Sequence, residues 1–120
     1  MSKKTLVLGA SLKAERYSNI VIHRLRKYNV ETVAIGLRPG TIDDVAIDTD
    51  LVPYEDVDTV TLYLNPQRQE PYYEYILSLN PNRVIFNPGT ENPTFYKKLQ
   101  NDGVEVEVAC TLVMLGTKQY

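Results

Sequence analysis

The sequence contains no tryptophan, one histidine and one cysteine among its 120 residues. The single thiol, Cys110, cannot form an internal disulfide, and it cannot supply a metal cage that needs several cysteines. These absences exclude a disulfide-stabilised fold and a structural zinc site of the multi-cysteine type. They also agree with a reducing compartment.

Long hydrophobic runs and an excess of positive charge are also absent. No window approaches the roughly 20 apolar residues of a membrane span, and Lys3 and Lys4 lead directly into a strand-like segment rather than a signal-peptide core. The 13 basic and 15 acidic residues give a net charge of −2, so the chain lacks the positive field that non-specific nucleic-acid binding requires. We therefore expect a cytoplasmic protein with no membrane or nucleic-acid partner.

Apolar residues make up 43% of the chain, which is enough to build the core of one domain spanning residues 1–120. They form short β-branched runs that alternate with stretches of helical spacing. This pattern predicts strands at residues 5–8, 32–35, 59–64, 83–86 and 104–108, a very short strand near 45–47, and helices over 18–28, 70–79 and 93–101.

Four of these strands are too continuously apolar to have a solvated face, which is typical of a parallel sheet covered on both sides. The run 104–108 alternates valine with glutamate, so we expect it at an edge of the sheet. The predicted fold is therefore α/β: a Rossmann-like, doubly wound parallel sheet of five to six strands in the order 3-2-1-4-5, with helices on both faces.

Several residues mark the predicted helix boundaries. Ser18 is placed to cap the first helix, Asn92 and the proline after it form a capped start, and Gly103 ends that helix. Pro71 would break a helix running through it, so residues 65–69 are interpreted as a turn, with the main helix beginning near residue 70.

Ligands of doubly wound sheets bind at the carboxyl ends of the strands, so the loops after the strands are the candidate sites. After the first strand, Gly9 allows close backbone approach, and the free N–H groups of the following helix, near Ser18, face an anion such as phosphate. Only the first glycine of the dinucleotide fingerprint is present. A tight turn without a ligand is therefore the alternative interpretation of this loop.

The loop after the second strand argues against NAD. An NAD site places an acidic residue there to bind the ribose hydroxyls, whereas this chain has Gly36, Leu37 and Arg38. An arginine at this position favours a ligand whose adenosine ribose carries a phosphate. The alternative is an arginine that is simply solvated.

Several segments of the chain together resemble a known protein family. The segments 9–11, 16–19, 58–66, 83–92 and 109–111, and above all the Asn-Pro-Gly-Thr-Glu-Asn block at 87–92, together resemble the small single-domain CoA-binding proteins. That family is similar to the nucleotide-binding domain of the succinyl-CoA synthetase alpha subunit. The resemblance covers nearly the whole chain.

The resemblance implies a Rossmann-like domain that binds coenzyme A or acyl-CoA, with the first loop at the phosphates and the loop after the second strand at the adenosine end. In the synthetase, a phosphorylated histidine lies in a second domain, which we do not expect in this chain. Matched position by position, with Lys13 and Ser18 added from the first loop and helix start, the expected binding residues are Gly9, Ala10, Ser11, Lys13, Arg16, Ser18, Asn19, Arg38, Pro39, Asn65, Pro66, Asn87 and Gly89.

The remaining candidates for chemistry have plainer explanations. His23 lies among cations on a helix face, so no catalytic role is assigned to it. Cys110 follows the last strand at a predicted helix start, where a thiolate would be stabilised, although buried cysteines are commonly inert.

The acidic residues between 43 and 56 are irregularly spaced, which is typical of a solvated loop rather than a metal site. Packing explains most of the nine tyrosines, and an exposed pair would suit a dimer face or stacking on adenine.

The sequence thus predicts a CoA-binding module without catalysis of its own. Two alternatives stay open. One is an enzyme in which Cys110 accepts an acyl group from a bound thioester. The other keeps the fold as an NADP-type nucleotide sensor or as a protein-interaction domain with an empty cleft.

Overall fold

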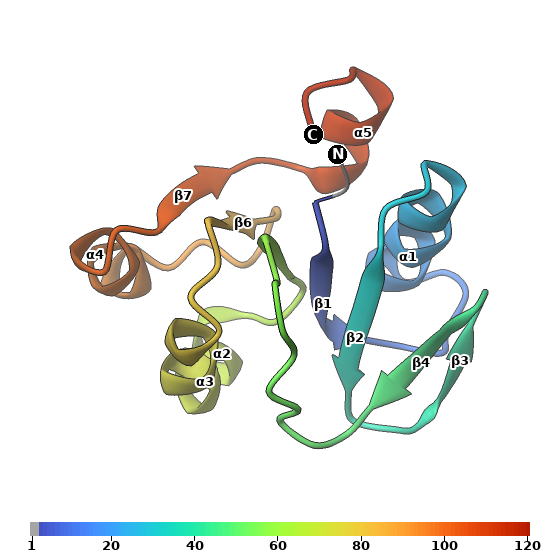
Figure 1. The fold of residues 1–120 in the computed structure, drawn as a ribbon, viewed down its shortest axis with the longest axis horizontal. Helices are drawn as coiled ribbons and strands as arrows, with labels where there is room; N and C mark the ends of the chain where they lie inside the picture. The colour runs from blue at the N-terminus through green and yellow to red at the C-terminus, as the bar shows by residue number, and fades with distance from the viewer. Residues whose placement is uncertain (1–2) are drawn as a thin grey trace.

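The computed structural model describes residues 3–120 and contains one mixed sheet flanked by helices (Figure 1). The sheet has seven strands in the order β3-β4-β2-β1-β5-β6-β7. All neighbouring strands are parallel except β3 and β4. The strands are β1 Thr5–Ala10, β2 Thr32–Gly36, β3 Gly40–Ile42, β4 Val45–Asp48, β5 Thr59–Leu62, β6 Arg83–Phe86 and β7 Glu105–Val108.

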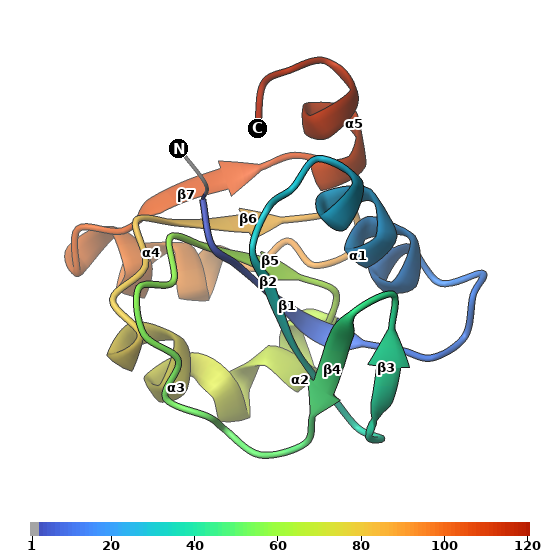
Figure 2. The same ribbon diagram turned by 45° about the vertical axis from the view of Figure 1, so that its right-hand side comes forward.

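Helices cover both faces of the sheet (Figures 1 and 2). They are α1 Tyr17–Lys27, α2 Pro66–Gln69, the 3-10 helix η1 Glu70–Tyr72, α3 Tyr73–Ser78, α4 Pro93–Asn101 and α5 Thr111–Gly116. Within residues 3–120, no helix has the length and apolar character needed to cross a membrane.

Alternate side chains of the strands build two separate cores. Leu6 and Leu8 of β1 point to the face that α3 and α4 cover, where Phe95 is fully buried. Val7, between the two leucines, points to the opposite face, where it packs with α1 and α5. Burial on both faces explains why the central strands read as continuously apolar, and it confirms the predicted Rossmann-like α/β class.

The predicted strand order is also found, with one strand that the sequence pattern missed. If β4 is counted as the third predicted strand, the observed order agrees with 3-2-1-4-5, and β7 lies at the edge as expected. The missed strand is β3, which pairs antiparallel with β4 through Thr41 opposite Ala46. A strand of three residues is too short to show a period, so the expected five to six strands become seven.

Two predicted boundaries need correction. The start of α1 is capped by Arg16 rather than Ser18, without a side-chain hydrogen bond, and Ser18 lies buried inside the first turn. Residues 65–69 are not an irregular turn, because α2 occupies Pro66–Gln69 with the Asn65 side chain as its cap. The longer helix, α3, therefore begins at Tyr73 rather than near residue 70.

The boundaries of α4 are as predicted. The Asn92 side chain accepts a hydrogen bond from the backbone N–H of Phe95 at 3.2 Å, and Pro93 occupies the first turn. The helix ends at Asn101, and Gly103 follows with a φ of +79°, a conformation that glycine adopts without strain.

The irregular segment 49–58, which connects β4 to β5, is held by two tyrosines. The Tyr54 hydroxyl donates to the carboxylate of Asp48, and the Tyr75 hydroxyl donates to the carbonyl of Val52 at 2.5 Å. Burial raises the pKa of Tyr75 to about 12, so this hydroxyl stays protonated as a donor at neutral pH.

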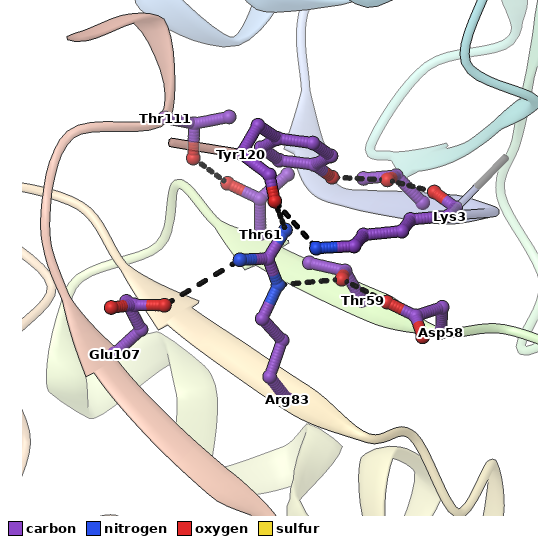
Figure 3. A network of polar contacts seen from close by, with 9 residues as sticks. Lys3, Asp58, Thr59, Thr61, Arg83, Glu107, Thr111 and Tyr120 are labelled. Atoms are coloured by element: carbon purple, nitrogen blue, oxygen red, sulfur yellow. Dashed lines mark hydrogen bonds and ion pairs between the residues drawn. The ribbon is translucent and has the colours of Figure 1, made fainter. Parts of the chain in front are cut away.

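A polar network lies around the amino-terminal ends of the strands (Figure 3). The buried guanidinium of Arg83 donates to Thr59 Oγ1 at 2.8 Å and to the carbonyl of Tyr120 at 3.2 Å, and it lies 4.4 Å from the centre of the Tyr120 ring. Glu107 forms an ion pair with it at 3.5 Å, and Lys3 Nζ donates to the Tyr120 carbonyl at 2.6 Å. These contacts fasten the segment after α5 to the sheet.

Candidate functional site

A cavity of about 700 Å³ opens at the carboxyl ends of β1, β2, β5 and β6. Its size is within the usual range for small-molecule and cofactor sites. The strand order explains its place, because the chain runs from β1 to β2 on one side and then returns to β5 on the other. The loops that follow these strands diverge at that point and leave room for a ligand. The walls come from segments 9–13, 16–18, 35–38, 63–65 and 88–90, with Arg68 and Tyr72.

Two glycines bring the backbone segments around the cavity into close contact. Gly9 has a φ of +97°, and a Cβ atom there would lie 3.1 Å from the Leu64 side chain and from the carbonyl carbon of Tyr63. At Gly36 a Cβ atom would lie 2.3 Å from the carbonyl oxygen of Ala10. Both glycines line the cavity, and both are also required by the packing of strand ends against each other.

The charge of the cavity wall has one sign. Four basic residues line it, namely Lys13, Arg16, Arg38 and Arg68, and no aspartate or glutamate among residues 3–120 does so. All four side chains are exposed. The ion pairs in the described part of the chain involve other basic residues, so the charges of these four are not paired with a carboxylate there. The wall is therefore suited to an anion with several negative charges.

Most of the expected binding residues line this cavity. Nine of the thirteen do so: Gly9, Ala10, Ser11, Lys13, Arg16, Ser18, Arg38, Asn65 and Gly89. The other four, Asn19, Pro39, Pro66 and Asn87, are not part of the wall.

The two asparagines outside the wall support it from behind. Asn19 is buried and its side chain donates to the carbonyl of Ser11 at 2.9 Å, which holds the loop after β1 against α1. Asn87 is also buried, and its side chain donates to Thr61 Oγ1 at 2.7 Å and to the carbonyl of Leu62 at 2.9 Å. Its Oδ1 atom accepts from the backbone N–H of Thr111 at 2.9 Å. The amide group of Asn87 is thereby fully bonded, and both asparagines position loops rather than lining the cavity.

The fully buried side chain of Gln69 joins the loops on the other side of the cavity. Its Nε2 atom donates to the carbonyls of Leu64 and Thr90, both at 2.8 Å, and its Oε1 atom accepts from Asn92 Nδ2 at 3.0 Å. Since Leu64 and Thr90 both line the cavity, Gln69 sets the spacing between the loops after β5 and β6.

Tyr63 lines the cavity, and its hydroxyl group is largely buried. Burial raises the pKa of its hydroxyl, although hydrogen bonds with Thr61 and Thr111 act in the opposite direction. The hydroxyl therefore stays neutral at physiological pH and remains a donor.

The two candidates for nucleophilic and acid–base chemistry lie outside the cavity wall. Cys110 is half-buried at the residue before α5, and it is not among the lining residues. His23 is exposed on α1, where its Nδ1 atom lies 3.7 Å from a carboxylate oxygen of Asp43. No group of three or more histidine, cysteine or acidic residues within 3–120 is arranged to hold a metal ion.

Several wall residues are not expected from the sequence, of which Arg68, Tyr17, Tyr63 and Tyr72 are the largest. Arg68 is not expected there because Pro71 favours a turn at residues 65–69 over a helix. The signal was present, since asparagine followed by proline marks a helix start and places residue 68 in the first turn. The tyrosines carried no comparable signal, because an aromatic residue next to a strand is as common in a core as at a cleft.

Comparison with known proteins is consistent with this geometry. A family model described as a CoA binding domain matches residues 3–116. The crystal structure of an uncharacterized protein is 44% identical in sequence, covers 100% of this chain and 99% of that chain, and superposes with a TM-score of 0.97.

More distant structures share the fold. The structure of cell-free ID.343 from Thermus thermophilus is 20% identical, covers 99% of this chain and 91% of its own, and gives a TM-score of 0.86. A hypothetical protein from Pyrococcus horikoshii OT3 is 21% identical in sequence. The match covers 98% of this chain and 84% of that chain, and the TM-score is also 0.86. No functionally curated protein matches the chain.

Proposed function

Because the chain belongs to the family of CoA-binding domains, we propose that it binds coenzyme A or an acyl-CoA in the cavity at the carboxyl ends of the strands. The observation that carries the proposal is the wall with four uncommitted cations and no acidic residue among those described. Coenzyme A has a ribose 3′-phosphate and a pyrophosphate, which together present several negative charges. A polyanion of this kind gains from each cation that it meets in a partly enclosed cleft.

The strand order suggests how the ligand lies. Lys13 and Arg16 belong to the loop after β1, next to the first turn of α1, and this place suits the pyrophosphate. Arg38 follows β2, where it suits the ribose 3′-phosphate. The pantetheine arm would then run past the ends of β5 and β6, where Tyr63 and Gly89 line the cavity.

Within this proposal the protein is a binding module rather than an enzyme. Transfer or hydrolysis of an acyl group requires a nucleophile or a general base within reach of the thioester. Cys110 and His23 are outside the cavity wall, and the Glu91 carboxylate beside it accepts a hydrogen bond from the N–H of Gly89 at 2.9 Å. The groups that do line it are cations, hydroxyls, small residues and apolar residues, which are suited to holding a ligand.

The deciding experiment compares coenzyme A with dephospho-CoA, which lacks the 3′-phosphate, by titration calorimetry. In the variant Arg38→Glu a charge-assisted contact is replaced by repulsion, so binding of coenzyme A should weaken by at least ~1.5–3 kcal/mol. Dephospho-CoA should be affected much less. The control is Lys97→Glu, an equal charge reversal on α4 outside the cavity, which should bind both ligands as the wild type does.

Two results would contradict the proposal. Equal losses of both ligands in Arg38→Glu would remove the assignment of Arg38 to the 3′-phosphate. Failure of the wild-type protein to bind coenzyme A, together with binding of NADPH, would favour the nucleotide-sensor alternative.

A further inference from the structure

The outer face of α1 carries positive charge along its whole length. Arg16, which precedes the helix, is followed at intervals of three or four residues by Ile20, Arg24 and Lys27, so these side chains share one face. The helix lies between α5 and the hairpin of β3 and β4, and Arg16 and Lys27 are exposed to solvent (Figure 2). We call Arg16, Arg24 and Lys27 the basic stripe.

The charges of the basic stripe are not balanced by neighbouring carboxylates. None of the ion pairs found within residues 3–120 involves Arg16, Arg24 or Lys27, and α1 itself contains no aspartate or glutamate. The helix dipole favours the cations in the last turn of α1, but it disfavours a cation at the first turn, where Arg16 lies. The stability of the helix therefore does not account for the whole stripe.

The basic stripe is narrow, because acidic residues lie on the hairpin side of α1. Asp44 forms an ion pair with Arg26 at 2.8 Å, and a carboxylate oxygen of Asp43 lies 3.7 Å from His23 Nδ1. A bilayer or a nucleic-acid duplex has a broad anionic surface, which would bring negative charge against these two carboxylates as well. A row of acidic side chains on one protein segment can lie along α1 without meeting them. The distribution of charge thus favours an acidic protein partner.

The basic stripe begins at the cavity. Arg16 lines the cavity, and in the proposed orientation it meets the pyrophosphate of coenzyme A. From Arg16 to Lys27 the helix rises about 16 Å, which is three turns of a partner helix. The pantetheine arm of coenzyme A also occurs on carrier proteins, where one phosphate joins it to a serine side chain. With that phosphate at Arg16, the surface of the carrier begins where the stripe begins.

We propose that the basic stripe docks an acidic segment of a carrier protein whose phosphopantetheine arm enters the cavity. This inference rests on the proposed binding of coenzyme A, because it places the same arm in the same cavity. The two ligands differ in their outer contacts. Coenzyme A has a 3′-phosphate for Arg38, whereas a carrier protein lacks this phosphate and meets Arg24 and Lys27 instead.

The test compares coenzyme A with an acidic acyl carrier protein, used in its holo form, which bears the arm, and in its apo form, which lacks it. In calorimetry at low salt, the wild type should bind the holo form at least ~10-fold more tightly than the apo form, because arm and surface bind together. The double variant Arg24→Glu/Lys27→Glu should bind the holo form at least ~10-fold more weakly than the wild type does. Its affinity for coenzyme A should stay within about twofold of wild type, which also shows that it is folded. Arg38→Glu should do the reverse, weakening coenzyme A and leaving the holo form bound.

The matched control is Lys97→Glu/Lys98→Glu, an equal charge reversal on α4, which should bind the holo form as the wild type does. The inference is overturned, with the CoA-binding proposal intact, if a wild type that binds coenzyme A does not bind the holo form or does not distinguish it from the apo form. An unchanged affinity in Arg24→Glu/Lys27→Glu would also overturn it. Binding to phosphatidylglycerol vesicles that this variant loses would assign the stripe to a membrane instead. If coenzyme A does not bind to the wild type, the proposed function fails, and this inference fails with it.

Discussion

Glycines with a left-handed backbone conformation have different surroundings in this chain. Gly9 and Gly103 have φ angles of +97° and +79°. A side chain at Gly103 would meet nothing within 4 Å, whereas one at Gly9 would press against Leu64 and Tyr63. The same backbone conformation therefore reflects a helix stop in one case and close packing at the cavity in the other.

This difference leads to a prediction for Gly9→Val. The valine is strained by its φ angle and crowded at 3.1 Å by the loop after β5, so the free energy of unfolding should fall by about 2–4 kcal/mol. Coenzyme A binding should be lost as well, because this loop lines the cavity. Chemical denaturation and calorimetry measure the two effects.

Gly103→Val is the matched control for Gly9→Val. It has the backbone strain alone, so it should cost about 1–2 kcal/mol and leave binding unchanged. Equal stability losses in the two variants would contradict the role of packing at Gly9. A folded Gly9→Val protein with normal affinity would place the ligand elsewhere.

Asp58 gives the stability of the protein a dependence on acid. Burial favours its neutral form, yet hydrogen bonds from Asn82 and Thr59, both 2.7 Å long, lower the pKa of its carboxyl below the usual value of 3.8. A carboxyl whose pKa is lower in the folded than in the unfolded state stabilises the fold above 3.8, and this contribution is lost as the pH falls through the folded-state pKa.

We therefore expect the wild type to be more stable than Asp58→Asn at pH 7, with the difference shrinking as the pH falls below about 4. Urea denaturation at a series of pH values measures this. Asn82→Ala removes one of the two donors and should show a weaker dependence of the same sign. A difference between wild type and Asp58→Asn that stays constant down to pH 2 would contradict the assignment.

At the scale of elements, α2 connects the two loops that form one side of the cavity. Its buried Gln69 bonds to the carbonyls of Leu64 and Thr90 and to the side chain of Asn92. Gln67, on the same short helix, is exposed. Gln69, which links two cavity loops, can therefore be compared with Gln67, which is in solvent on the same helix.

Gln69→Leu should lower the free energy of unfolding by at least about 3 kcal/mol, because buried polar groups of three residues lose a partner and each costs roughly 1–3 kcal/mol. It should also weaken coenzyme A binding, since the loops lose their fixed spacing. Gln67→Leu should change stability by less than about 0.5 kcal/mol. Loss of stability without any change in affinity would show that α2 does not shape the cavity.

The elements also show how far the sequence determines the fold and the site. Strands β1, β2, β5, β6 and β7 are predictable because each has a run of apolar or alternating residues. The hairpin strand β3 is not, because its residues, Gly-Thr-Ile, acquire a strand conformation only by pairing with β4. The same holds for Asn87, whose place after a strand suggests the cavity, while its actual partners lie on β5 and α5. Long-range pairing of this kind leaves no local pattern.

At the scale of the whole molecule, the separation of the reactive side chains from the cavity predicts an absence of turnover. We expect saturable binding of coenzyme A and no release of free thiol from acetyl-CoA or succinyl-CoA above the uncatalysed rate. A thiol-specific dye follows the reaction. Steady release that disappears in Cys110→Ser would support the acyl-transfer alternative instead.

The register of the central strands has a consequence for how the protein forms during synthesis. Thr5 of β1 pairs with Thr32 of β2 on one side and with Thr59 of β5 on the other. Half of the chain must therefore leave the ribosome before the middle strand has both neighbours, and the cavity also needs Thr90. Sheets built from such distant pairings fold slowly and expose apolar strands meanwhile. On the proposed function, coenzyme A would bind only once these distant segments have come together, so it would stabilise late species on this pathway and not the nascent first half of the chain.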